Sequence, residues 1–215
     1  MTYPFSTGFS LGLGLANTGL SMGSTGSRYF HLNRADSGIN IPEVALSSDF
    51  MISFIFSASG TEAQYIYDNA VVEDRVYCLI DGSSGLILVP AGQVVTVDGG
   101  PNNVNLLDGK LHSVLITGNG DNKKLSRLCM RFTDNESLLG TLSDFKVYDA
   151  GELIRSYPVN DSGNTIRDIV SGQNGVIING TAGDWGLFKE QPTLWKGQGL
   201  DVPPWALSDQ ELIKA

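Results

Sequence analysis

Tyrosines gather with an acid and an amide in one stretch of the chain, "QYIYDNAVVEDRVY", at positions 64–77. Alternation along two extended segments places the tyrosines on the faces opposite the apolar residues of the same segments. Aromatic rings beside an Asp/Asn pair can stack a sugar ring and fix its hydroxyl groups. Tyrosine is also a common half-exposed strand residue, so ordinary packing is the alternative. The candidate carbohydrate-binding residues are Tyr65, Tyr67, Asp68, Asn69 and Tyr77.

Two sequence patterns that could indicate an enzyme lack the surrounding structure that catalysis requires. The segment "GFSLG" at positions 8–12 matches G-x-S-x-G, but Leu-Gly-Leu follows it where that motif requires a helix. Glycoside hydrolysis needs two carboxylates facing one substrate, whereas alternation puts Glu73 and Asp74 on opposite faces. We therefore predict no catalytic residues and no enzymatic activity.

The two histidines and two cysteines are interpreted as structural. His112 and His31 each lie within a strand-like segment, where a hydrogen-bonded sheet histidine is the simplest interpretation. Cys78 lies on an apolar face, and Cys129 alternates with two arginines on a face opposite Leu128. The thiols should therefore be free rather than joined in a disulfide.

Composition limits the classes of partner. The chain has 215 residues, 41% hydrophobic and only 17% charged, which suits one globular domain with extensions. A net charge of −9 disfavours nucleic acid, which needs a basic face, but is compatible with a calcium site. No window resembles a membrane span, and the first residues lack the features of a secretion signal. We expect synthesis in a cytoplasm and no membrane span.

Strand patterns dominate the part of the chain that must position these side chains. Short alternating segments are bounded by Gly, Asn, Asp or Pro and recur every 8–15 residues or so, as in antiparallel sandwiches. In "FMISFIF" the inward face is predicted to carry Ile52, Phe54 and Phe56. In "DFKVYD" it is predicted to carry Phe145 and Val147. We expect an all-β protein with less than about a tenth of its residues helical.

Two extensions differ from the middle of the chain. Residues 1–27 are rich in Gly, Ser and Thr, yet carry an alternating apolar stripe, and residues 189–215 contain tryptophans and a Pro-Pro pair. Both extensions pack either on their own domain or on a neighbouring subunit. The candidate assembly residues are Phe9, Leu11, Leu13, Leu15, Trp195 and Trp205.

Three segments occur in the order of a known domain family. These are "RYFHLNRADSGINIPEVALSSDFMISF", "LLDGKLHSVLITG" and "GTLSDFKVYD", spread over positions 28–149. Together they resemble the strands of laminin-G-like, concanavalin A-like domains. The resemblance implies a jelly-roll sandwich of two antiparallel sheets over residues 28–188.

The resemblance extends to residues 150–188, which are similar to an appendix that follows such domains in many bacteriophage tail and other virion proteins. The matching positions are Tyr157, Asp161, Gly163, Asp168, Gly172, Gly175, Ile177 and Asn179. An ordered segment that wraps along the sandwich is implied. In related sandwiches an acid at the position of Asp144 can hold a structural calcium ion, and Asp36 is a candidate second ligand. A surface acid beside Lys146 is the alternative for Asp144.

These features lead to one expected function and two alternatives. The expected function is that of a non-enzymatic virion protein of a bacteriophage, in the tail or on the capsid surface, for host adhesion or decoration. Its expected partners are other virion subunits, in a homo-oligomer or on a particle, and host-surface glycans. A free carbohydrate-binding module or lectin is the first alternative, and a glycan-degrading enzyme is the second.

Overall fold

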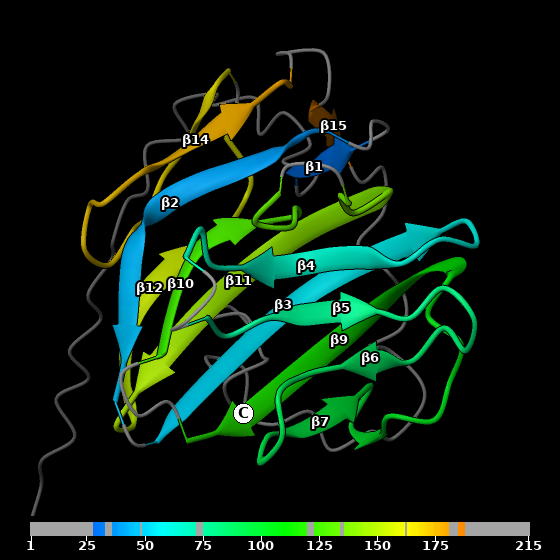
Figure 1. Ribbon diagram of the computed structural model, residues 1–215. Helices are drawn as coiled ribbons and strands as arrows, with labels where there is room; N and C mark the ends of the chain where they lie inside the picture. Colours follow the sequence, from blue (N-terminus) through cyan, green and yellow to red (C-terminus); the bar gives the residue numbers. More distant parts are fainter. Residues whose placement is uncertain are drawn as a thin grey trace, which may run out of the picture.

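The computed structural model describes residues 28–32, 36–47, 49–71, 75–119, 123–133, 136–161, 163–180 and 185–187. Within these residues the protein is all-β, with two antiparallel sheets packed as a sandwich and no helix (Figure 1). The predicted fold class is therefore confirmed at the level of a β-sandwich. The candidate assembly residues at positions 9, 11, 13, 15, 195 and 205 lie outside the described residues.

One sheet has eight strands. Its path is β15 (Trp185–Leu187), β1 (Arg28–Leu32), β11 (Gly140–Asp149), β3 (Phe50–Ser59), β9 (Asp108–Gly118), β7 (Val94–Val97) and β8 (Gly100–Pro101), and β12 (Glu152–Tyr157) also pairs with β11. The long strands β3, β9 and β11 form the centre of this sheet, behind β4 and β5 in Figure 1.

The other sheet has seven strands. Its order is β13 (Thr165–Ile166), β14 (Gly175–Ile178), β2 (Gly38–Leu46), β10 (Lys123–Leu128), β4 (Gln64–Asp68), β5 (Cys78–Ile80) and β6 (Ile87–Leu88). Strand β2 bends between its pairing with β14 and its pairing with the start of β10 (Figure 1). This sheet carries most of the side chains singled out in the sequence.

The core between the sheets is built on an aromatic cluster. Phe54 is 2% exposed, and its ring centroid lies 5.8 Å from that of Phe56, 5.9 Å from Phe145 and 6.2 Å from Tyr67. Ile52 and Val147 are fully buried around it. The predicted inward faces of β3 and β11 are therefore confirmed, since alternation puts these side chains on one side of each strand.

Alternation fails at three positions where the backbone is irregular. Strand β4 bulges at Ile66, so that Tyr65 pairs with Leu79 but Tyr67 pairs with Cys78. The extra residue turns Tyr67 toward the core, where it is fully buried, and the predicted outward face for Tyr67 is wrong. Cys129 follows β10 with φ of 62° and is also fully buried, so its predicted polar face is wrong as well. The third position is Asp144, with φ of 50°.

Asp144 lies where β11 changes its neighbour. Leu142 pairs with Phe30 of β1, whereas Phe145 pairs with Tyr157 of β12, so both strands share one edge of β11. The register with β3 shifts between Ser143 and Lys146, which is the mark of a bulge. The bulge lets Leu142 and Phe145, three positions apart, both face the core.

The described residues of positions 150–180 supply strands to both sheets. They supply β12 to the eight-stranded sheet and β13 and β14 to the seven-stranded sheet. A buried carboxylate, Asp168, ties these strands together: its Oδ1 accepts hydrogen bonds from the N–H groups of Ser156 (2.9 Å) and Val170 (3.0 Å). A methyl group at Gly175 would lie 2.9 Å from Ile41 Cγ2, so the close approach of β14 to β2 requires glycine there.

Candidate functional site

The most unusual side-chain cluster lies on the outer face of the seven-stranded sheet. Val76, Cys78 and Ile80 are fully buried and face the core, so alternation turns Arg75 and Tyr77 outward. Tyr65 is also on the outer face, because it pairs with Leu79 rather than with Cys78. Three short segments therefore meet above this sheet: β4, the approach to β5, and the turn that follows β10.

Five side chains from these segments form a closed cycle, which we call the aromatic–arginine ring. Its members are Tyr65, Arg75, Tyr77, Arg131 and Phe132. The guanidinium carbon of Arg75 lies 4.5 Å from the ring centroid of Tyr77 and 5.0 Å from that of Phe132. That of Arg131 lies 5.1 Å from Phe132 and 5.6 Å from Tyr65. Contact between the two tyrosines, with centroids 6.4 Å apart, closes the cycle.

The ring rests on a buried carboxylate. Asp68 is 0% exposed, and its Oδ2 accepts a hydrogen bond from the N–H of Phe132 at 3.2 Å. Its Oδ1 accepts from the N–H of Asn69 at 2.8 Å and lies 3.5 Å from Nε of Arg75. Burial raises the pKa of Asp68, although these N–H groups and the two arginines of the ring act in the opposite direction. From beneath the ring, Asp68 thus holds in place both the turn after β10 and the Arg75 side chain.

The ring presents partly exposed cations between aromatic faces. The Arg75 side chain is 16% exposed, and that of Arg131 is 31% exposed. Arg131 Nη1 donates to Glu136 at 2.6 Å, while its Nε has no hydrogen-bond partner within the described part of the chain. A guanidinium over an aromatic face is attracted to the ring electrons and is held in a fixed orientation.

The structure brings together only part of the predicted carbohydrate site. Tyr65 and Tyr77 are neighbours on the outer face, but Tyr67 belongs to the core. Asn69 is buried, with its side-chain oxygen accepting from Ser126 Oγ at 2.7 Å and its Nδ2 donating to the carbonyl of Val71 at 3.1 Å. Asp68 and Asn69 therefore hold the protein together and leave no group free for a sugar hydroxyl.

The sequence did not indicate three members of the aromatic–arginine ring as site residues: Arg75, Arg131 and Phe132. The spacing Arg75-x-Tyr77 was a usable signal, since residues two apart on a strand share a face. The contribution of Arg131 and Phe132 had no such signal, because the left-handed residue Cys129 interrupts the strand alternation just before them. Their place depends on hydrogen bonds such as that from the N–H of Cys129 to the carbonyl of Ile66, 2.7 Å.

The two predicted calcium ligands lie apart. Leu32 pairs with Gly140 and Phe30 with Leu142, so Asp144 lies toward the start of β1, whereas Asp36 follows its end. Asp144 Oδ2 pairs with Lys146 Nζ at 3.0 Å, which is the alternative weighed for this acid. The described residues contain no group of three or more His, Cys, Asp or Glu side chains placed to hold a metal ion. The calcium site thus remains a prediction.

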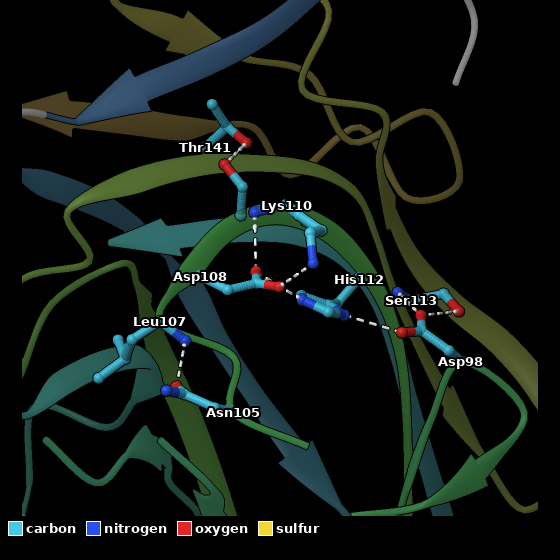
Figure 2. A network of polar contacts seen from close by, with 9 residues as sticks. Asp98, Asn105, Leu107, Asp108, Lys110, His112, Ser113 and Thr141 are labelled. Carbon is cyan, nitrogen blue, oxygen red and sulfur yellow. Dashed lines mark hydrogen bonds and ion pairs between the residues drawn. The ribbon is translucent and has the colours of Figure 1, made fainter. Parts of the chain in front are cut away.

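A second polar cluster surrounds His112 on β9 (Figure 2). Its Nδ1 lies 2.8 Å from Asp98 Oδ2 and its Nε2 lies 3.1 Å from Asp108 Oδ1. The hydrogen bond with Asp98 is the main cause that raises the pKa of His112 above its ordinary value. Ser113 Oγ donates to Asp98 rather than to the imidazole. Both ring nitrogens are occupied by carboxylates, so this cluster is a structural link, as expected for a satisfied sheet histidine.

The cysteines form no disulfide, as expected. Cys78 and Cys129 are both free and fully buried, and burial raises the pKa of each thiol. A buried thiol with a raised pKa is a poor nucleophile. None of the described residues belongs to a helix long and apolar enough to cross a membrane.

Comparison of the chain with protein-family models, with curated proteins and with solved structures finds no match in any of the three.

Proposed function

We propose that the protein is a non-enzymatic binding protein of a virus particle, and that it attaches to glycans on a host surface through the aromatic–arginine ring. The observation that carries the binding function is the closed cycle of three aromatic and two arginine side chains on an outer sheet face. Tyr77 and Phe132 are only partly buried, so their rings are accessible to a flat ligand. Stacking on aromatic faces is a common way to bind a sugar ring.

The particle location is supported by the sequence resemblance. The residues that resemble the appendix of virion proteins have clear structural roles here, which is a physical reason for that pattern. Asp161 accepts hydrogen bonds from the N–H of Arg167 at 2.7 Å and from its Nε at 2.5 Å, and Asn179 Nδ2 donates to the carbonyl of Asp36 at 3.0 Å. The concanavalin A-like jelly roll is the specific sandwich that we propose.

The binding function is tested by calorimetric titration of the full chain with oligosaccharides chosen from a glycan array. Replacing Tyr77 by alanine should weaken binding by about tenfold or more, because a stacked aromatic contributes both area and geometry. Tyr148→Ala is the matched control, since Tyr148 is a half-buried tyrosine on the other sheet. If no glycan binds, or if both variants behave alike, the ring is not a carbohydrate site.

The particle location is tested by mass spectrometry and antibody labelling of purified particles. We expect the chain in stoichiometric amounts on the particle surface. A protein that binds glycans through the ring, but is absent from particles, would instead be a free lectin. This second candidate is favoured by the same observation, because the ring lies within one chain and needs no partner subunit.

A further inference from the structure

The aromatic–arginine ring has more cationic character than stacking of a neutral sugar requires. Three of the seven arginines of the chain, Arg75, Arg127 and Arg131, lie at this one place, although the chain has a net charge of −9. Among the described residues, these three guanidinium groups face two carboxylates, Asp68 and Glu136. Among these described groups, the cations outnumber the carboxylates by one, in a chain whose net charge is −9.

Arg75 is the preorganised cation of this site. Its guanidinium lies between Tyr77 and Phe132, and only its Nε faces Asp68. Within the described part of the chain, its two terminal nitrogens have no hydrogen-bond partner. Packing between two rings removes much of the freedom that an arginine would otherwise lose on binding. Terminal nitrogens in one plane match the two oxygens of a carboxylate.

Arg131 supplies a second cation, which also contacts Phe132. The two guanidinium carbons lie 5.0 Å and 5.1 Å from the same phenyl centroid. Arg131 is partly neutralised by Glu136, whereas Asp68 lies fully buried beneath the ring. The accessible surface thus alternates aromatic and cationic groups over a short distance, which suits a ligand with a flat apolar face and an acid on its edge.

We propose that the ligand of the aromatic–arginine ring is an acidic sugar whose carboxylate is bound by Arg75, with Arg131 as the second cation. This inference rests on the proposed carbohydrate-binding function and names its ligand class. The sugar ring stacks on Tyr77 or Phe132, and the carboxylate replaces water at the terminal nitrogens of Arg75. A hydrogen bond between two charged groups is about twice as strong as a neutral one, so the acid decides the specificity.

The test compares matched ligands on the intact chain. Oligomers of galacturonic acid and the same oligomers reduced to galactose differ only in the carboxylate, and both are titrated by calorimetry at two salt concentrations. We expect the acidic oligomer to bind at least about tenfold more tightly, with an advantage that falls as salt rises. Equal affinity for both oligomers would refute the proposal that the ligand is acidic, but would leave the proposed carbohydrate-binding function standing. No binding of either oligomer, nor of any glycan on an array, would overturn both.

Substitutions test whether Arg75 binds the carboxylate of the sugar. Arg75→Gln should lose most of the preference for the acidic oligomer, and Arg75→Lys should retain part of it, because lysine keeps the charge but not the planar fork. Arg131→Gln, whose partner Glu136 is partly exposed, provides a second variant if Arg75→Gln unfolds. Lys110→Gln is the control, since Lys110 is 77% exposed on the other sheet. An unchanged preference in both arginine variants would refute the assignment.

Single-stranded oligonucleotides also combine aromatic bases with anionic groups, and they form a further arm of the titration. The acidic protein as a whole should repel their phosphate chain. Binding of an oligonucleotide more tightly than any acidic sugar would overturn the proposal in favour of a nucleic-acid ligand.

Discussion

At the scale of single residues, His112 shows how charge and burial combine. His112 is 8% exposed, and its imidazole links Asp98, in the turn after β7, to Asp108 at the start of β9. Burial raises the pKa of Asp98, but the hydrogen bonds from His112 and Ser113 outweigh it and leave that pKa below its ordinary value. Burial likewise raises the pKa of Asp108, while bonds from Lys110 and His112 bring it down to about 2. The cluster is therefore most stable with a charged imidazolium between two carboxylates.

This arrangement predicts a pH-dependent contribution to stability. The raised pKa of His112 means that its contribution is full below the unfolded value of about 6.5 and is lost as pH rises through the folded value. The lowered pKa values of the two acids mean that their contribution is lost as pH falls below about 4. Urea unfolding from pH 3 to pH 9 measures the free energy of unfolding of the wild type and of His112→Gln. The wild type should be the more stable protein by the largest margin between about pH 4.5 and 6.5. A difference independent of pH would show that His112 is neutral in the folded protein.

The aromatic core gives the second prediction at this scale. Phe54→Ala should lower the free energy of unfolding by roughly 3–5 kcal/mol, because it leaves a cavity bordered by three other aromatic rings. Ile55→Ala, at the half-buried neighbouring position, is the control and should cost clearly less. Chemical denaturation measures both, and a loss for Phe54→Ala below about 1 kcal/mol would contradict the position of the core.

Residue-level prediction from the sequence succeeds where the strand is regular and fails where it bulges. The inward side chains of β3 and β11 follow alternation, but Tyr67 and Cys129 do not. One inserted residue at Ile66 reverses the faces of everything after it in β4. Nothing within the segment "QYIYD" marks that insertion, since it is defined by the register of β4 against β5. The predicted carbohydrate residues therefore include two members of the aromatic–arginine ring, Tyr65 and Tyr77, together with Tyr67, which belongs to the core.

At the scale of elements, the segment after β11 connects the two layers. It pairs β12 with β11, then β14 with β2, so that a continuous stretch borders both sheets. The resemblance predicted an ordered, wrapping segment here, and its composition alone would have suggested a loop rich in Gly, Asn, Asp and Ser. The polar residues are ordered because they form hydrogen bonds with each other and with strand ends. Ser171 Oγ, for example, donates to Asp168 Oδ2.

Asp168 is the residue on which this connection depends most. Burial raises its pKa, yet the hydrogen bonds from Ser156, Ser171 and Val170 leave the pKa below its ordinary value, so the carboxylate is charged at neutral pH. Asp168→Ala should cost roughly 2–4 kcal/mol, because the N–H groups of Ser156 and Val170 lose their acceptor. Asp49→Ala, at an exposed position, removes the same charge as a control. Hydrogen exchange should show faster exchange in β12 and β14 only in the first variant; equal protection in both would contradict this role.

At the scale of the whole molecule, the sandwich and its extensions have separable tasks in this proposal. All strands that the structure describes lie between Arg28 and Leu187, and the buried hydrophobic core runs from Phe30 to Ile177. The aromatic–arginine ring also lies within this range, so ligand binding should belong to the sandwich. The strand and turn pattern of the sequence was enough to predict an all-β sandwich. The particle and the partner subunits remain proposals, because they depend on surfaces outside the chain's own core.

The last prediction separates folding from assembly by deleting residues 1–27 and 190–215. The truncated protein should unfold cooperatively within about 4 °C of the full chain, which corresponds to about 1 kcal/mol in a domain of this size. It should also bind acidic sugars with unchanged affinity.

Its incorporation into particles should be lost, because the apolar stripe at positions 9–15 and the tryptophans at positions 195 and 205 are the residue types that interfaces bury. Competition between tagged full-length and truncated chains during particle assembly measures this directly. A truncated chain that enters particles as well as its competitor would show that both extensions serve only their own domain, and assembly would then have to use the sandwich itself.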